Sequence, residues 1–456
     1  MALRFIDLFA GLGGFHFALE ELGCKCVFAS ELKEDLRKLY EINFPTCIVR
    51  GDITKIQPEE IPSHDILCAG FPCQPFSQAG KRQGFNDEQD RGNLFNNIYE
   101  ILKVHRPRYV LLENVANLKG HDGGNTWKVI YHKLSDSIEN GGLNYEVRQE
   151  ILSPHQFQIP QHRRRIYVVC ENRDFGCLEH FQFPIPTTRK CDISKIIEED
   201  DIDYIPLKAE TRHQLAVWQE FLNECVKHHV EIPSFPIWAM EFGATYKYEE
   251  KAPACQNVSD LNGKLGKLGQ LISGNTLEEC LACLPNYSQT KKNDTFPSWK
   301  IRYIQQNRDF YIKNEGWLKK WMEHIRGFEN SHQKLEWNCG RENVLPILDD
   351  KIIQFRASGI RVKLPTFSPA LNLCGTQIPI LPWVKLPNEN LLNGSLIRGR
   401  YLTRNEAAKL QGMKKLKFGD DFYQLSVPRS YAALGNAVNV TIVKHLAKRL
   451  LSYERS

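Results

Sequence analysis

Short apolar runs alternate with amphipathic stretches through about the first 175 residues of the chain. The apolar runs have the length of buried strands, and the amphipathic stretches have the spacing of helices. Strands that alternate with helices form βαβ units, so the pattern predicts an α/β fold with a parallel sheet covered on both faces. The expected strands are 4–9, 26–30, a run ending near Asp52, 65–69, 109–113, 145–152 and 165–170, and the expected helices are 15–22, 35–43 and 93–104.

The pattern changes near residue 185, where regular alternation stops and aromatic and basic residues mix with Asn, Gly and Pro. It changes back toward the end of the chain, where helices are expected at 405–411 and 437–453. We therefore predict three segments. Residues 1–184 form the first part of the α/β domain, 185–395 form a separate domain, and 396–456 return to complete the first.

Composition is that of a soluble globular protein, with 42% hydrophobic and 25% charged residues. No run of about 18 apolar residues occurs, which argues against a membrane span. The chain opens on a strand containing Arg4 and Asp7 rather than on a signal peptide, so we expect its 14 cysteines to be buried thiols in a reducing compartment. The net charge of +5 permits a nucleic-acid partner without requiring one.

Two close cysteine pairs, Cys24 with Cys26 and Cys280 with Cys283, bear on metal binding. A zinc site needs about four ligands, and neither pair has an obvious second half in the sequence. Histidines elsewhere remain the open alternative. Ordinary buried cysteine is the better interpretation, so we predict no metal site.

A glycine-rich turn at 9–14 follows the first expected strand and opens the first expected helix. Glycines let the backbone turn sharply and approach a ligand closely, and the absence of GxGxxG spacing makes a dinucleotide less favoured. Glu31 ends the second strand, where a carboxylate can hold ribose hydroxyls, and Asp52 ends the third, where it can meet an adenine amino group. Each feature alone is open to a structural explanation, but together they indicate an adenosine-containing ligand.

Reactive side chains follow the next strands. Cys73 lies in a polar loop after the fourth expected strand, with prolines on both sides, which is not a normal position for a buried structural cysteine. Glu113 ends the fifth strand, which delivers its carboxyl group either to a site or to solvent. Strand alternation sends Arg163 and Arg165 to one face, as part of a site or as a basic face for phosphate.

In these positions the chain resembles the bacterial DNA (cytosine-5) methyltransferases of restriction-modification systems. The combination of PCQ, ENV and QxRxR is far more specific than a lone glycine turn. The resemblance implies a Rossmann-like, S-adenosylmethionine-dependent methyltransferase sheet with a second, smaller target-recognition domain at 185–395. It covers about the first 175 and the last 60 residues and is carried, in order, by 9–14, 70–77, 113–115, 161–165, 404–412 and 435–438.

The resemblance also implies roles for single residues. Cys73 would add its thiolate to carbon 6 of a flipped-out cytosine, so that carbon 5 can take the methyl group. Glu113 would hold ring nitrogen 3, a role that favours a raised pKa. Arg165 would contact the ring carbonyl oxygen, and Arg163 would help to set the geometry of thiolate and substrate. S-adenosylmethionine would contact Phe9, Gly11, Gly13, Glu31, Asp52, Ile53, Pro72, Asn436 and Val438, and DNA would contact Gln74 and Ser77.

Two features depart from the family pattern. Arg404 stands where the family more often has proline, although a helix can still begin there. The turn-forming residues of 381–394 indicate an insertion or linker. Lysines and arginines of 185–395 are candidates for phosphate contacts, although a solvated basic surface is the better interpretation of any single one. The sequence does not single out the residues that read bases.

The expected partners are double-stranded DNA and a cognate restriction endonuclease that acts separately, although the sequence does not decide whether such a nuclease exists. We expect a monomer, in the bacterial cytoplasm and associated with the nucleoid, with no membrane partner. The main alternative is the same chemistry on tRNA. An oxidoreductase is disfavoured by the missing GxGxxG motif, and a catalytically inactive DNA-binding relative is disfavoured by intact Cys73, Glu113 and Arg165.

Overall fold

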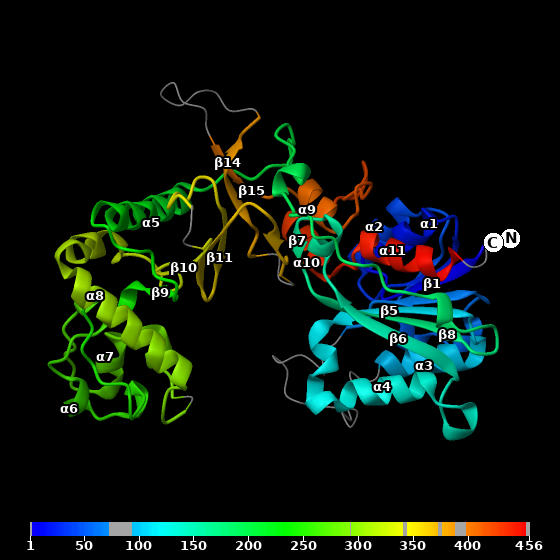
Figure 1. Ribbon diagram of the computed structural model, residues 1–456, viewed down its shortest axis with the longest axis horizontal. Coiled ribbons are helices and arrows are strands. Elements are labelled where there is room, and N and C mark those ends of the chain that lie inside the picture. The colour runs from blue at the N-terminus through cyan, green and yellow to red at the C-terminus, as the bar shows by residue number, and fades with distance from the viewer. Residues whose placement is uncertain are drawn as a thin grey trace. The chain divides into compact units, whose positions relative to one another are not determined.

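The computed structural model describes residues 2–72, 94–291, 293–340, 344–372, 376–387 and 398–452. The chain divides into two compact units (Figure 1). Unit 1 consists of Met1–Glu198, Thr366–Thr376 and Thr403–Ser456, and unit 2 consists of Glu199–Pro365 and Gln377–Leu402.

Unit 1 is built on a seven-stranded sheet with the order β3-β2-β1-β4-β5-β8-β6. Neighbouring strands from β3 to β5 are parallel, whereas β8 runs antiparallel to both β5 and β6. The predicted α/β fold with a largely parallel sheet is confirmed. The strands are β1 (Arg4–Leu8), β2 (Lys25–Ser30), β3 (Val49–Arg50), β4 (Ile66–Ala69), β5 (Tyr109–Val115), β6 (Tyr145–Leu152) and β8 (Arg165–Asn172).

Helices cover both faces of this sheet, with α1, α2 and α11 on one side and α3 and α4 on the other (Figure 1). The central strands read as continuous apolar runs because both faces are buried. In β4, for example, all four residues are buried. The sequence pattern predicted α1, α2 and α3 but not α4. The helices are α1 (Gly14–Glu20), α2 (Glu34–Asn43), α3 (Leu94–His105), α4 (Asn125–Ser135), α9 (Arg404–Leu410), α10 (Val427–Asn436) and α11 (Val440–Leu450).

The return segment of unit 1 begins with α9, where Thr403 and Glu406 form a capping box. This cap explains why Arg404 is tolerated in place of the family's proline. The final helix begins later than the predicted residue 437, because Asn439 is its N-cap and accepts a hydrogen bond from Ile442 N at 3.2 Å. Asn439 also donates to Leu410 O at 3.1 Å, which joins α11 to α9.

Unit 2 contains a six-stranded sheet with the order β15-β14-β11-β12-β10-β9 and two long helices, α5 (Ala209–Lys227) and α8 (Ser298–Ile325). Trp218 of α5 and Trp321 of α8 lie in its core with ring centroids 5.2 Å apart. The helix α8 departs from helical geometry at Asn314. Its strands are β9 (Ile237–Trp238), β10 (Lys334–Asn338), β11 (Ile352–Arg356), β12 (Gly359–Lys363), β14 (Ile380–Lys385) and β15 (Arg398–Tyr401), and its short helices are α6 (Val258–Leu261) and α7 (Leu277–Ala282).

The boundaries predicted at 185 and 395 fall earlier in the chain than the division in the structure. The chain stays with unit 1 up to Glu198, whose backbone N–H donates to Glu406 Oε1 at 2.8 Å. It stays with unit 2 until Leu402, whose N–H donates to Pro379 O at 2.8 Å. The stretch 366–376 also belongs to unit 1, since β13 (Ser368–Pro369) pairs with β7 (Gln161–His162).

The turn-forming residues of 381–394 were predicted to be an insertion or linker. That prediction is wrong for the first part of the stretch, which is strand β14. The strand pairs with both β11 and β15 inside the sheet of unit 2, and these backbone hydrogen bonds outweigh the turn propensity of Pro382. Residues 388–397 lie outside the described part of the chain.

Candidate active site

The glycine-rich turn after β1 takes up a backbone conformation that favours glycine at two of its positions. Phe9, Gly11 and Gly13 have φ values of 55°, 55° and 77°. A Cβ atom on Gly13 would lie 2.3 Å from the ring of Phe44, so no larger residue fits there. A Cβ on Gly11 would meet only Phe9 O, at 3.9 Å, so the space over Gly11 is open to a ligand. The turn therefore fits the close approach of a bound group.

Two carboxylates stand at the ends of the strands beside this turn. Glu31, which follows β2, accepts hydrogen bonds from Gly11 N and Lys33 N, each at 2.9 Å, and so ties the turn to the neighbouring strand. Asp52, which follows β3, accepts from Thr54 N at 3.0 Å through Oδ1 and caps the short 3-10 turn that begins at Ile53. Since β1, β2 and β3 are parallel neighbours, the turn and both acids share the carboxyl edge of the sheet.

The return segment packs against this edge at Val438. A Cβ on Gly14 would lie 2.5 Å from Val438 O, and a Cβ on Gly70 would lie 2.9 Å from Val438 Cγ2. Gly70 follows β4, and its added Cβ would also be 4.0 Å from Glu113 Oε2. The structure thus brings together the glycine turn, the end of β4, the Glu113 carboxyl and the return segment. Asn436 is exposed at the end of α10 and donates to Ala432 O at 2.8 Å.

Glu113 lies on β5 opposite Tyr167 of β8, with a side chain only 8% exposed. Arg165 Nε lies 3.2 Å from Glu113 Oε1. The geometry of this ion pair is not that of a hydrogen bond, so within the described residues Oε1 is buried without a hydrogen-bond partner. Burial raises the pKa of Glu113, and the charges of Arg165 and Arg163 only partly offset that effect. Burial therefore makes ionisation of this carboxyl less favourable than in water.

Arg163 is placed differently from Arg165. It precedes β8 rather than lying in it, yet the alternation of exposure persists, with Arg163 buried and Arg164 exposed. Its guanidinium donates to Gly435 O at 2.7 Å and to Ala437 O at 2.9 Å. Arg163 therefore holds the return segment in place, while Arg165 stands beside the carboxyl of Glu113.

Asn114 has a positioning role that the sequence analysis did not assign. Its Nδ2 donates to Phe71 O at 3.1 Å, and its Oδ1 accepts from Val115 N at 2.8 Å. These bonds anchor the start of the loop that leads from β4 to Cys73. The position of Asn114 beside Glu113 in the ENV motif is the sequence signal that could have indicated this role. Pro72 is exposed, whereas the predicted residues Cys73, Gln74 and Ser77 lie outside the described residues.

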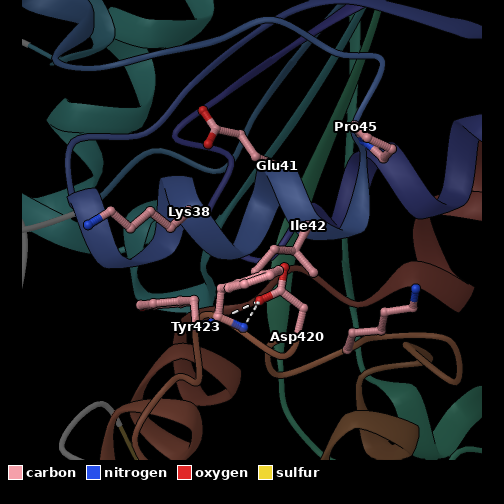
Figure 2. Close-up of a pocket in the computed structure, with 8 residues that line it drawn as sticks. Lys38, Glu41, Ile42, Pro45, Asp420 and Tyr423 are labelled. Atoms are coloured by element: carbon pink, nitrogen blue, oxygen red, sulfur yellow. Dashed lines mark hydrogen bonds between the residues drawn. The ribbon is translucent and has the colours of Figure 1, made fainter.

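A surface hollow of about 530 Å³ lies elsewhere on unit 1, between α2 and the chain that follows α9 (Figure 2). Asp420 shapes one wall by accepting hydrogen bonds from Phe422 N and Tyr423 N, each at 2.9 Å. None of the predicted site residues lines it, so the hollow is separate from the candidate site. Its lining residues are Lys38, Glu41, Ile42, Pro45, Lys417, Asp420, Phe422 and Tyr423.

Comparison with known proteins identifies relatives of this chain. The chain is 48% identical over 199 residues to the Type II methyltransferase M.HaeII of Haemophilus aegyptius, covering 43% of this chain and 58% of that protein. It is 45% identical over 184 residues to the Type II methyltransferase M.HhaI of Haemophilus parahaemolyticus, covering 40% of this chain and 53% of that protein. The chain thus spans about half the length of these curated relatives.

Likeness of fold extends over the whole chain. A solved structure of the Entamoeba histolytica methyltransferase EhMeth superposes with a TM-score of 0.52 at 16% identity and covers 100% of both chains. This likeness confirms the predicted Rossmann-like sheet. No helix in the described ranges has the length and apolar character needed to cross a membrane. The model of the C-5 cytosine-specific DNA methylases matches residues 3–452. The resemblance inferred from the motifs is confirmed, and the chain belongs to the C-5 cytosine-specific DNA methylase family.

Proposed function

We propose that this protein transfers a methyl group from S-adenosylmethionine to carbon 5 of a cytosine in double-stranded DNA, through a covalent adduct with Cys73. The observation that carries the proposal is the Glu113 carboxyl. It is buried, its pKa is raised, and it is paired with Arg165 at the same sheet edge as an open glycine turn. A family member with this site has the groups that cytosine activation needs.

The carboxyl edge fits S-adenosylmethionine, which supplies an electrophilic methyl group when bound. Phe9, Gly11 and Gly13 would pass close to the ligand, and the space over Gly11 supports this. Glu31 would hold the ribose hydroxyls while it keeps its hydrogen bond to Gly11 N. Asp52 would take the adenine amino group through Oδ2, since Oδ1 is engaged by Thr54. The remaining contacts would come from Ile53, Pro72, Asn436 and Val438.

The chemistry follows from the charges at the site. Cytosine carbon 5 is a weak nucleophile, and addition of the Cys73 thiolate to carbon 6 would make it enamine-like so that it can take the methyl group. Loss of the carbon-5 proton and of the thiolate from carbon 6 would then restore the ring and free Cys73. Glu113, whose pKa is raised by burial, would hold ring nitrogen 3 and help to protonate it as carbon 6 is attacked. Arg165 would neutralise charge on the ring carbonyl oxygen. Arg163 would act through the return segment, whose carbonyls it binds.

The target base is stacked inside a duplex, so the enzyme must flip it out of the helix. Gln74 and Ser77, which neighbour Cys73 in the sequence, would contact the DNA there. Unit 2 would act as the target-recognition domain. The names of the relatives support a role as the modification enzyme of a restriction-modification system, with a cognate endonuclease acting separately. We expect a monomer that works on DNA in the bacterial cytoplasm.

Trapping on DNA that contains 5-fluorocytosine tests the proposal. Fluorine at carbon 5 cannot leave as a proton does, so the covalent adduct accumulates and is seen as a shifted band on a denaturing gel. We expect an adduct with wild type and S-adenosylmethionine, and none with Cys73→Ser. Cys177→Ser, a change at an exposed cysteine, is the matched control and should form adduct normally. An undiminished adduct with Cys73→Ser would overturn the mechanism.

Substrate choice needs a second measurement. Methyl transfer to duplex DNA and to tRNA is compared with tritiated S-adenosylmethionine under the same conditions. We expect incorporation into DNA alone, and incorporation into tRNA alone would assign the same chemistry to RNA. Bisulfite sequencing of the methylated DNA then identifies the recognition site.

A further inference from the structure

We propose that His16, Cys26 and Cys47 form a binding site for a thiophilic divalent cation such as Zn²⁺ beneath the glycine-rich turn at 9–14, which is called the cofactor turn below. The sequence predicted no metal site, because neither of its close cysteine pairs has a second pair of ligands nearby along the chain. The three proposed ligands are far apart in the sequence and meet only in the folded protein. The proposal is independent of the proposed activity.

The three nitrogen and sulfur ligands come from separate elements of unit 1. His16 lies on α1, Cys26 on β2, and Cys47 in the chain before β3. Their ligand atoms all lie within 4.8 Å of one another, and the two Sγ atoms are 3.0 Å apart. Zinc bonds of about 2.3 Å to sulfur and 2.0 Å to nitrogen place tetrahedral ligands on the order of 3.5 Å from each other. The cluster therefore needs only small shifts to enclose an ion.

The buried carboxyl group of Asp7, on β1, is a second observation that favours a cation near this cluster. Its side chain is fully buried, and within the described residues neither carboxylate oxygen has a hydrogen-bond partner. A buried carboxyl without a partner costs free energy that a cation would recover. We therefore infer that the cation would also compensate the charge of Asp7, which is not itself one of the three ligands.

Tyr40 of α2 is the neighbour that would orient the imidazole. Its hydroxyl lies 2.7 Å from His16 Nδ1 and 4.0 Å from Cys26 Sγ. Metal-binding histidines are commonly held by a hydrogen bond of this kind. The ring of Phe44 stacks on His16 at 3.7 Å between centroids and also fills the space that a Cβ on Gly13 would need. The cluster is thus in direct packing contact with the cofactor turn.

This packing suggests what the cation would do. It would join α1, β2 and the approach to β3, which are elements that shape the cofactor pocket. No open ligand position faces solvent, since His16, Cys26 and Cys47 are 4%, 8% and 8% exposed. The site is therefore structural rather than catalytic, and loss of the cation should weaken both folding and cofactor binding.

The first test is metal content. The full chain is produced without a polyhistidine tag in zinc-supplemented medium, and bound metal is measured by mass spectrometry after gel filtration. We expect about one zinc per wild-type chain, and at least a tenfold lower content for Cys47→Ser and Cys26→Ser. Cys24→Ser is the matched control, because Cys24 is as buried as Cys26 but is not one of the ligands. It should keep its zinc.

The second test needs no variant and so does not depend on whether the serine variants fold. Metal-free wild type is titrated with Co²⁺ alone, and absorption is followed in the near ultraviolet and the visible. Two thiolate ligands in a tetrahedral site should give sulfur-to-cobalt charge-transfer bands and visible bands that saturate at about one equivalent. Added Zn²⁺ should abolish them. Wild type that holds no zinc and gives no cobalt bands would overturn the proposal, as would equal loss of zinc from Cys24→Ser.

Discussion

Glu113 in unit 1 and Glu241 in unit 2 are both buried glutamates that pair with an arginine, but they differ in how completely their charge is satisfied. The side chains of Glu113 and Arg165 are 8% and 16% exposed, and those of Glu241 and Arg308 are 0% and 12% exposed. Burial alone therefore does not distinguish the two glutamates. They differ in the hydrogen bonds that their carboxylate oxygens accept.

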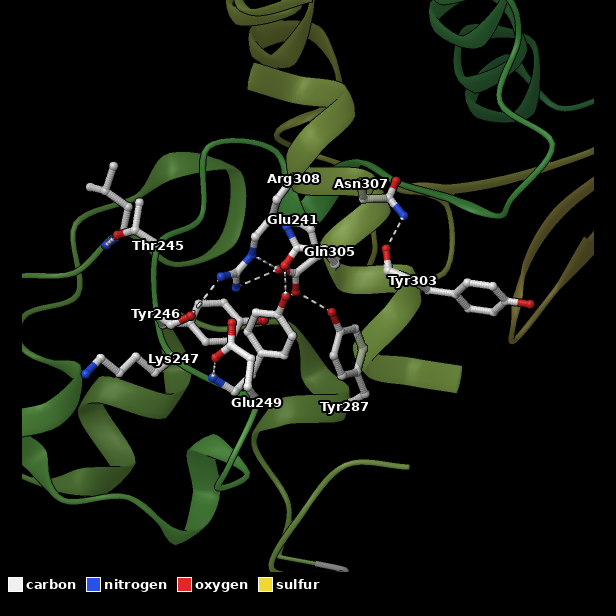
Figure 3. Close-up of polar contacts among 12 residues, drawn as sticks. Glu241, Thr245, Tyr246, Lys247, Glu249, Tyr287, Tyr303, Gln305, Asn307 and Arg308 are labelled. Carbon is white, nitrogen blue, oxygen red and sulfur yellow. Dashed lines mark hydrogen bonds and ion pairs between the residues drawn. The ribbon is translucent and has the colours of Figure 1, made fainter. Parts of the chain in front are cut away.

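Glu241 is surrounded by donors (Figure 3). Its Oε1 accepts from the hydroxyls of Tyr246 and Tyr287, and its Oε2 accepts from Arg308 Nε at 2.9 Å. Arg308 also donates to Tyr246 O at 2.8 Å and lies over the rings of Tyr246 and Tyr248 at 4.3 and 4.5 Å. Burial lowers the pKa of Arg308, but the carboxylate of Glu241 outweighs it, and the pKa lies above its ordinary value.

Glu113 shows the opposite balance. Burial raises its pKa, and two nearby arginines do not compensate. One of its oxygens has no hydrogen-bond partner among the described residues. A satisfied buried charge rigidifies its surroundings, whereas an unsatisfied one stores free energy that a ligand can recover. The difference supports a structural role for Glu241 and is consistent with the chemical role proposed for Glu113.

The largest expected effect is on catalysis. Glu113→Gln keeps the shape of the side chain but removes its proton, so methyl transfer per folded molecule should fall about 10²–10⁴-fold. Its unfolding free energy should stay the same or rise, because a neutral group replaces a poorly solvated acid. Single-turnover kinetics and urea unfolding measure the two quantities. Loss of stability with activity retained would reverse the roles assigned to the two glutamates.

Glu241→Gln should show the converse. It leaves the Arg308 charge buried and uncompensated, so the free energy of unfolding should fall by about 3–5 kcal/mol. Activity per folded molecule at low temperature should be kept. The double variant Glu241→Gln/Arg308→Met is the control and should recover part of the loss, since it removes both charges. Loss of activity at unchanged stability in Glu241→Gln would contradict a structural role.

The two arginines near Glu113 sharpen the comparison within unit 1. Arg163→Met removes two charged hydrogen bonds to the return segment, so stability should fall by about 2–3 kcal/mol and the KM for S-adenosylmethionine should rise. Arg165→Met should instead lower kcat and leave that KM nearly unchanged. Steady-state kinetics and thermal unfolding of both variants provide the test. Identical effects of the two substitutions would show that the arginines share one role.

The smallest effect is the pH dependence of stability. Since the pKa of Glu113 is raised in the folded state, the folded protein holds this proton more tightly than the unfolded chain does. The resulting stability is complete below the ordinary pKa of 4.5 and is lost as pH rises through the raised value. Wild type should therefore lose stability relative to Glu113→Gln as pH rises, in urea titrations at matched pH. A difference that stays constant with pH would contradict the raised pKa.

Much of unit 1 could be predicted from the sequence, because its strands are buried on both faces and read as apolar runs between helical stretches. The chain order of Glu31, Asp52 and Glu113 at successive strand ends was equally accessible, since parallel strands deliver their carboxyl ends to one edge. Unit 2 was harder. Its sheet mixes parallel and antiparallel pairs of short strands, and β14 contains Pro382 in a stretch rich in turn-forming residues.

The sequence by itself determined which reactive residue types the chain carries and the order in which strand ends present them, because motif spacing and strand periodicity are local properties. Only the tertiary structure decided what each buried group contacts. It directs Arg163 to the carbonyls of Gly435 and Ala437, leaves an oxygen of Glu113 unsatisfied among the described residues, and gathers His16 with Cys47. Hydrogen bonding and desolvation depend on neighbours that are distant along the chain, so no local pattern can encode them.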